Sequence, residues 1–220
     1  MLTKELIYFF LQINSAEVYN KFFKRKKMNF LAHLYLSDDI EEIIVGNILA
    51  DMLKGQNISK FNEKIVKGIE LHRKIDKFTD QHHVVNKTKQ RLRPLFKHYS
   101  PVVVDVYYDH FLAVNWKDYS EIPLKEFANN CYNVLRKHKE LFPFRFKQAL
   151  KYHRFRKLLT SYTEIKGIRF AFKRLENRSM YISNLHLAPK ELERNYFLYY
   201  EEFREFFEDL KDFTGKQIKG

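Results

Sequence analysis

The chain has 220 residues, a formal net charge of +13 and an apolar content of 45%. This length fits one domain with a sizeable core, or at most two small ones. Six glycines and five prolines are too few for a fold with many tight turns, so we expect long helices and few hairpins. The single cysteine, Cys131, excludes an internal disulfide and fits a reducing cytoplasm. No apolar run approaches the ~20 residues that a bilayer-spanning helix needs.

The excess of lysine and arginine predicts an acidic partner, which could be nucleic acid, an anionic membrane surface or an acidic protein. Charge alone does not choose among these partners, and many basic proteins are merely soluble. The sequence contains no RNA- or DNA-binding signature, no Walker loop, no glycine-rich dinucleotide loop and no Gly-x-Ser-x-Gly elbow. We therefore expect no nucleic-acid partner.

Residues 1–27 form an apparent appendage to the rest of the chain. Leu2 to Phe23 could form an amphipathic helix, and a basic run, Lys24 to Lys27, closes it. In a secretory signal peptide the basic run would precede the apolar stretch. Met28 then opens a denser apolar pattern, so we predict an N-terminal extension at 1–27 and a single domain at 28–220.

The domain itself is expected to be all-α. Ser100 and Pro101 form a helix start, with serine at the cap and proline at the first helical position. The last helix carries an aromatic stripe in helical register, which indicates core packing. The expected helices run from about Ile40 to Leu53, from Lys60 (capped by Ser59) to Thr79, onward through Arg91 with a break or kink at Pro94, from Ser100 to Asn115, and from Lys190 to Phe213; Pro123, Pro143 and Pro189 are expected to open helices.

Residues 68–80 contain the first candidate site. In a helix, His72, Asp76 and Asp80 share one narrow strip, because residues four apart lie nearly above one another. Imidazole and carboxylate ligands suit manganese, iron or zinc better than calcium. The alternative is a surface helix with ordinary ion pairs, of which Glu70 and Lys74 could form one.

A second candidate group lies in residues 104–111. Asp105, Asp109 and His110 stand in an otherwise apolar run, and buried charges need partners. A divalent cation would relieve the like-charge conflict between Asp105 and Asp109, and also that between Asp76 and Asp80. The alternative partners are the many lysines and arginines and, for His110, a structural hydrogen bond.

Two more positions gain weight only as members of a set. His33 lies in an apolar run and would, by itself, be a core histidine. Asp51 follows Asn47 by four residues at the end of an expected helix, where a capping or ion-pair role is the simple alternative.

Four blocks, in this order, resemble the acyl carrier protein phosphodiesterase family. They are Met28–Leu34 (MNFLAHL), Gly46–Asp51 (GNILAD), Gly68–Asp76 (GIELHRKID) with Thr79–Asp80, and Asp105–Leu112 (DVYYDHFL). The resemblance covers the chain from Met28 onward, is strongest through Trp116, and leaves residues 1–27 outside. The family is similar, at a distance, to the helical bundle of the His-Asp phosphohydrolases.

The resemblance implies a cytoplasmic enzyme that hydrolyses holo-acyl carrier protein to the apo form and releases 4′-phosphopantetheine. It implies a divalent metal, typically Mn²⁺, with Mg²⁺ or Fe²⁺ as alternatives. A water activated by the metal would attack phosphorus, and cleavage on the serine side would regenerate the carrier's hydroxyl. Arg73, beside His72, is a candidate phosphate contact. Carried over by position, the motif residues are His33, Asp51, His72, Asp76, Asp109 and His110, with Asn47, Asp80 and Asp105 as polar neighbours. We infer that these six hold the metal, with Asp51, His72, Asp76 and Asp109 as the first choices, and that Asp51, His72 and Asp76 are also catalytic.

Carrier proteins are small and acidic, so a basic surface would steer and hold them. The expected docking residues are Lys87, Lys89, Arg91 and Arg93, with a second candidate surface from Arg145 to Lys157. Two other functions stay open. One is a His-Asp-type phosphohydrolase of nucleotides or other small phosphodiesters, and the other is a non-catalytic basic helical protein that binds nucleic acid.

Overall fold

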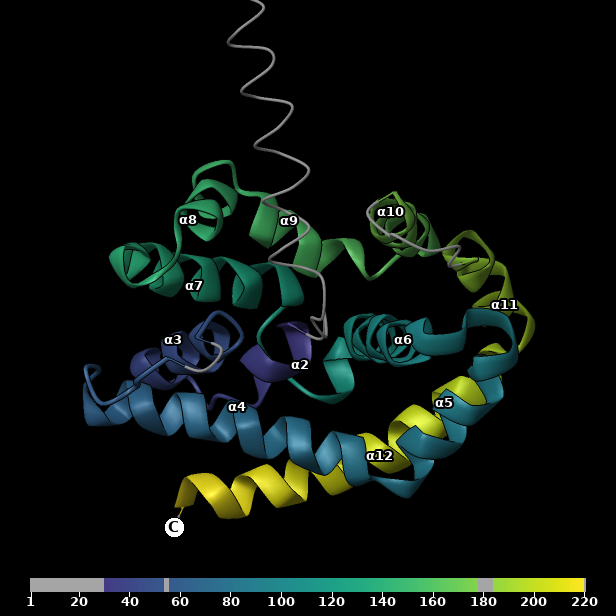
Figure 1. Ribbon diagram of the computed structural model, residues 1–220, viewed down its shortest axis with the longest axis horizontal. Helices are drawn as coiled ribbons and strands as arrows, with labels where there is room; N and C mark the ends of the chain where they lie inside the picture. Colours follow the sequence, from purple (N-terminus) through teal and green to yellow (C-terminus); the bar gives the residue numbers. More distant parts are fainter. Residues whose placement is uncertain (1–29, 54–55, 178–183, 220) are drawn as a thin grey trace, which may run out of the picture.

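A computed structural model describes residues 30–53, 56–177 and 184–219. Within these ranges every regular element is a helix and no strand occurs, which confirms the all-α prediction (Figure 1). The extension expected at residues 1–27 lies outside the described residues. None of the described helices combines the length and the apolar character that crossing a bilayer requires.

The helices stack in three levels in the view of Figure 1. The long helices α4 and α12 lie along the bottom, and α5 rises at the right-hand side. Helices α2, α3 and α6 lie at the centre, and α7 to α10 lie along the top. The α-helices are α2 (Phe30–Tyr35), α3 (Glu41–Ala50), α4 (Glu63–Gln81), α5 (His83–Phe96), α6 (Ser100–Val114), α7 (Leu124–Lys137), α8 (Phe144–Lys151), α9 (Arg154–Ser161), α10 (Ile165–Glu176), α11 (Ala188–Arg194) and α12 (Tyr196–Lys219). Short 3₁₀ turns are η1 (Lys97–Tyr99), η2 (Trp116–Asp118), η3 (Lys139–Leu141) and η4 (Leu185–Leu187).

Helices α3 and α4 touch through their main chains. A methyl group built on Gly46 would lie 2.1 Å from the carbonyl oxygen of Ile65 and 3.0 Å from the Cα of Gly68, which is closer than any side chain tolerates. Glycine at both positions therefore allows the two backbones to meet. This contact brings the residue after Gly46, Asn47, against the turn of α4 that follows Gly68 and carries His72.

The aromatic stripe of the C-terminal segment packs into the core as predicted. Tyr199, Phe203 and Phe207 on α12 are buried, and Phe203 lies 5.7 Å, ring centre to ring centre, from Phe111 on α6. The expected single helix is instead two helices, which meet at Asn195. The backbone of Asn195 is non-helical, with φ −120° and ψ 31°. Its side-chain amide donates to Glu191 Oε1 at 2.8 Å.

Several helix ends differ from the sequence prediction. Asn62, not Ser59, caps α4, because its side-chain oxygen accepts a hydrogen bond from the Ile65 amide at 2.9 Å. Pro94 lies inside α5 close to its end, where only one helical hydrogen bond is lost. Ser100 is the first residue of α6, and its hydroxyl donates to the Lys97 carbonyl at 2.7 Å.

Candidate metal centre

Three side chains from two helices converge between α2 and α4. Donor atoms of His33, His72 and Asp76 all lie within 4.8 Å of one another, so the group could hold a metal ion. His33 comes from α2, whereas His72 and Asp76 lie one turn apart on the face of α4 that packs against the core. The two imidazole rings are stacked, with centroids 4.2 Å apart and planes at 21°. Both histidines are buried, and the Asp76 side chain is 32% exposed.

Asn47 on α3 orients both rings. Its Oδ1 accepts hydrogen bonds from the Nδ1 of His33 at 2.8 Å and from the Nδ1 of His72 at 3.1 Å. The orientation of the amide follows from its other contacts: Nδ2 donates to the carbonyl of His33 and to Ser37 Oγ, both at 3.0 Å. Since an amide oxygen only accepts, both rings carry their proton on Nδ1. In the neutral form of each ring this leaves the lone pair on Nε2, and both Nε2 atoms face the carboxylates, as in a histidine metal ligand held by a second group.

The distances between donors suit a shared cation. His33 Nε2 lies 3.5 Å from Asp76 Oδ1, and His72 Nε2 lies 3.6 Å from Asp76 Oδ2. Both separations are too long for a hydrogen bond. Two atoms that each lie ~2.1 Å from one ion are at most ~4.2 Å apart, so these pairs fit a common ligand sphere. His33 Nε2 is also buried with no hydrogen-bond partner in the described part of the chain, which is the state of an imidazole that has kept a lone pair for a ligand.

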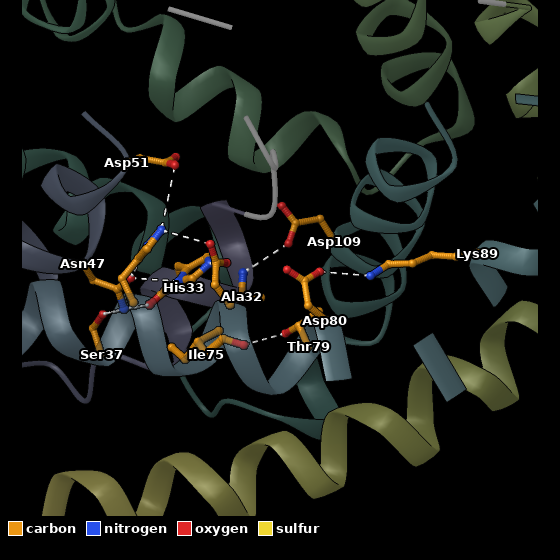
Figure 2. A network of polar contacts seen from close by, with 12 residues as sticks. Ala32, His33, Ser37, Asn47, Asp51, Ile75, Thr79, Asp80, Lys89 and Asp109 are labelled. Atoms are coloured by element: carbon orange, nitrogen blue, oxygen red, sulfur yellow. Dashed lines mark hydrogen bonds and ion pairs between the residues drawn. The ribbon is translucent and has the colours of Figure 1, made fainter. Parts of the chain in front are cut away.

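Asp51 stands at the edge of this group. It follows the last residue of α3, and its Oδ1 lies 3.8 Å from His72 Nε2. Its side chain is only 14% exposed. Figure 2 shows its carboxylate above Asn47 and His33, on the side away from the yellow helix α12. The structure thus brings together four of the six expected ligands, namely His33, Asp51, His72 and Asp76.

Asp109 is not brought into this group. Its Oδ2 accepts from the Leu31 amide at 3.2 Å. Its Oδ1 accepts from the Ala32 amide, also at 3.2 Å (Figure 2). These two amides belong to the first turn of α2, where no helical acceptor exists. Asp109 is fully buried, and burial raises its pKa well above the ordinary range, with a smaller contribution from nearby Asp105. The carboxyl group therefore caps the helix that carries His33.

His110 has protein partners on both ring nitrogens. Its Nδ1 donates to the Tyr162 carbonyl at 2.7 Å, so its Nε2 accepts from the Tyr196 hydroxyl at 3.0 Å. Burial lowers the pKa of His110, an effect that the hydrogen bond to Tyr162 partly opposes. His110 thus makes the kind of structural hydrogen bond that was the alternative to its expected role as a metal ligand.

The remaining expected site residues lie around the centre. Arg73 is exposed on α4 beside His72. Asp80 is exposed one turn beyond Asp76, and its Oδ1 accepts from Lys89 Nζ at 3.0 Å. Asp105 is buried on α6 near Asp109. None of these three belongs to the group of donors described above.

Comparison with known proteins identifies the family of the chain. The sequence model of the family described as acyl carrier protein phosphodiesterase matches residues 28–210. This chain belongs to the acyl carrier protein phosphodiesterase family. The match includes all four residues of the centre and leaves residues 1–27 outside.

Relatives of the same name are similar along most of the chain. An acyl carrier protein phosphodiesterase of Pectobacterium atrosepticum is 29% identical over 191 residues, which are 86% of this chain and 99% of the relative. One from an Enterobacter species is 30% identical over 181 residues, 82% of this chain and 94% of the relative. One from Escherichia coli is 40% identical over 106 residues, 48% of this chain and 54% of the relative. No solved structure matches the chain.

A pocket of about 470 Å³ lies beside the turn that carries Asp51. Met52, which follows Asp51, contributes to its wall, and Lys60 and Glu140 bring charges of opposite sign. The other lining residues are Leu49, Leu53, Gln56, Phe61, Leu141, Phe142 and Pro143.

Two residues of the centre have roles that the sequence did not reveal. Asn47 was expected only as a polar neighbour, yet its single oxygen orients both histidines. Ser37 was not expected at the site; it donates to the His33 carbonyl at 2.8 Å and accepts from Asn47. The signal available was a small polar residue four positions after His33, the spacing at which a serine hydroxyl reaches back to a helical carbonyl.

Proposed function

We propose that this chain is a metal-dependent phosphodiester hydrolase that converts holo-acyl carrier protein to the apo form and releases 4′-phosphopantetheine. Its family membership and its relatives' names support the substrate. The observation that carries the chemistry is Asn47, whose oxygen holds two stacked histidines with both Nε2 atoms turned toward one carboxylate.

His33, His72 and Asp76 would hold the metal. Two imidazole nitrogens and carboxylate oxygens form a donor set that suits Mn²⁺, Fe²⁺ or Zn²⁺, and we propose manganese. A bound divalent cation would lower the pKa of water and neutralise negative charge on the phosphoryl oxygens. Asn47 keeps the tautomer that ligation needs, and the buried walls around both rings keep them fixed.

Asp51 contacts His72 and is partly open to solvent, so it can receive the proton of an attacking water. Water oxygen then joins phosphorus, the bond from phosphorus to the carrier's serine oxygen breaks, and that oxygen takes up a proton. The products are the serine hydroxyl and 4′-phosphopantetheine. We propose the exposed Arg73 as a phosphate contact, and the pocket beside Met52 as the space for part of the pantetheine arm.

We also propose a cytoplasmic location. The one cysteine of the chain is a free and buried thiol, which is compatible with a reducing compartment.

Mass spectrometry of holo-carrier protein after incubation with the enzyme and manganese tests this function. We expect the carrier to lose the mass of phosphopantetheine, and we expect a chelator to prevent the loss. Nucleotides and cyclic dinucleotides, incubated in parallel, should remain intact. Robust nucleotide turnover beside an untouched carrier would overturn the proposal in favour of a nucleotide phosphohydrolase.

A further inference from the structure

Two basic regions were candidates for docking, and most residues of the first form ion pairs within the chain. Arg91 Nη1 lies 2.6 Å from Oε2 of Glu202, a buried carboxylate on α12, and Lys87 lies 3.8 Å from the other oxygen. Lys89 pairs with Asp80. Of the four residues expected on this strip, Arg93 alone is exposed without an ion pair among the described residues. The strip therefore leaves one cation without an ion pair among the described residues, fewer than the second region does.

The second region is larger than the sequence indicated and keeps most of its charge. Residues 144–177, which span α8, α9 and α10, contain ten lysines and arginines against two glutamates, a net +8 of the chain's +13. Lys147 pairs with Glu140, and Arg169 with Glu193. Five other basic residues are exposed and have no ion pair with a carboxylate in the described part of the chain. They are Lys151, Arg154, Lys157, Lys166 and Lys173.

Exposed aromatic rings lie among these charges. Tyr152 is 53% exposed, and its ring centre lies 5.7 Å from Lys151 Nζ and 5.3 Å from Arg154 Cζ. Phe144 and Phe170 are more exposed still, at 72% and 61%. Large apolar rings left in solvent beside cations are typical of a surface that a partner covers. We call residues 144–177 the α8–α10 face.

This face adjoins the metal centre. Phe155 on α9 packs edge-to-face on Phe30 at the start of α2, with ring centres 5.5 Å apart, and His33 lies one turn further along α2. Figure 1 shows α8, α9 and α10 on the opposite side of α2 and α6 from α12. A macromolecule held on this face would thus lie one helix layer from the group that we propose to be reactive.

We propose that the α8–α10 face is the docking surface for the acidic carrier protein, an inference that rests on the proposed function. The substrate's phosphodiester is attached directly to the carrier, so the carrier must bind next to the metal centre. An acidic helical surface complements unpaired cations, and exposed rings give it apolar contact. Charge complementarity of this kind acts mainly on the association rate and weakens as salt rises.

Binding of fluorescently labelled apo-carrier protein to the full chain tests the surface without any phosphodiester. We expect the double variant Lys151→Glu/Arg154→Glu, and separately Lys173→Glu, to weaken binding, by about tenfold for the double variant at low salt. The matched control is Lys67→Glu/Lys74→Glu on α4, which makes the same charge change at two exposed lysines outside the face. We expect less than about a twofold change for that control.

Three outcomes would contradict the docking surface, its occupant or the proposed function. Equal weakening by the α4 control would overturn the local surface in favour of a net-charge effect. Unchanged carrier binding, with the face variants instead losing binding to phosphatidylglycerol vesicles or to RNA, would overturn the carrier as occupant. Wild-type chain that binds apo-carrier through this face but leaves holo-carrier uncleaved would sink the proposed function and leave the docking surface standing.

Discussion

Two groups of histidine and aspartate lie beside helix α2, and their polar atoms have different kinds of partner. Asp109 accepts hydrogen bonds from two backbone amides, and His110 is hydrogen-bonded to a backbone carbonyl and a tyrosine hydroxyl. His33 and His72 each donate from Nδ1 to Asn47, and their Nε2 atoms lie 3.5 Å and 3.6 Å from the two carboxylate oxygens of Asp76. The same residue types thus support a helix in one place and form a group that could hold a cation in the other.

The largest expected effect comes from removing the carboxylate that both histidines face. Asp76→Asn keeps the shape but removes the negative charge, so we expect hydrolysis of holo-carrier to fall by more than about 100-fold. Asp80→Asn, one turn further along α4 and outside the centre, is the matched control and should keep most activity. Turnover measured by mass spectrometry, with the thermal midpoint as a check on folding, separates the two. Equal activity in both variants would remove Asp76 from the site.

Next in size is the loss of the shared acceptor. Asn47→Leu removes the oxygen that holds both Nδ1 protons, and we expect Mn²⁺ affinity to drop about 10- to 100-fold. Ser37→Ala should cost less, because it loosens Asn47 without removing its oxygen. Titration calorimetry with Mn²⁺ gives both affinities. A Leu variant that binds the metal as tightly as the wild type would mean that ring orientation does not depend on Asn47.

Asp109 offers the sharpest contrast between the two groups. Asp109→Ala leaves two first-turn amides of α2 without their acceptor, so we expect the free energy of unfolding to fall by about 1–3 kcal/mol. Asp109→Asn retains an acceptor and should cost less, since burial already disfavours the charged form of this carboxyl group. Urea denaturation measures both. If Asp109→Ala instead abolishes metal binding at unchanged stability, Asp109 returns to the ligand set.

The smallest effect is a pH dependence at His110. Burial lowers the pKa of this imidazole below the ordinary 6.5, so the unfolded chain binds its proton more readily than the folded one. Its contribution to stability is therefore present above pH 6.5 and is lost as the pH falls through the lowered value. His110→Asn should flatten that part of the curve of unfolding free energy against pH. An identical slope in the variant would show that His110 does not titrate on unfolding.

Much of the fold followed from local pattern, and so did part of the centre. The spacing of His72 and Asp76 depends only on helical geometry, and the structure has the two side chains 3.6 Å apart. The family resemblance added His33 and Asp51, which lie on other elements. Sequence spacing could not distinguish Asp109 from these residues, because a buried acid in an apolar helix looks the same whether its partner is a cation or an amide.

The ion pairs within the expected docking strip were hidden from the sequence for a related reason. Arg91 is neutralised by Glu202, which lies 111 positions later in the sequence, and no local pattern announces an ion pair of that separation. Residues 145–157 were identified from the mixture of charges and rings. Their continuation through α10 depends on helices that follow one another across a surface, which composition does not describe.

The close approach of Gly46 and Gly68 has a consequence for how this centre can vary. The separation of α3 and α4 is set there by main-chain atoms, which have no rotamers to relax. Changes of side chain elsewhere in the core can alter how it is filled without altering this distance. The distance between Asn47 and His72 therefore does not depend on how the rest of the core is packed. Gly46 and Gly68, which belong to neither group of polar residues, should accordingly tolerate substitution as poorly as a metal ligand would.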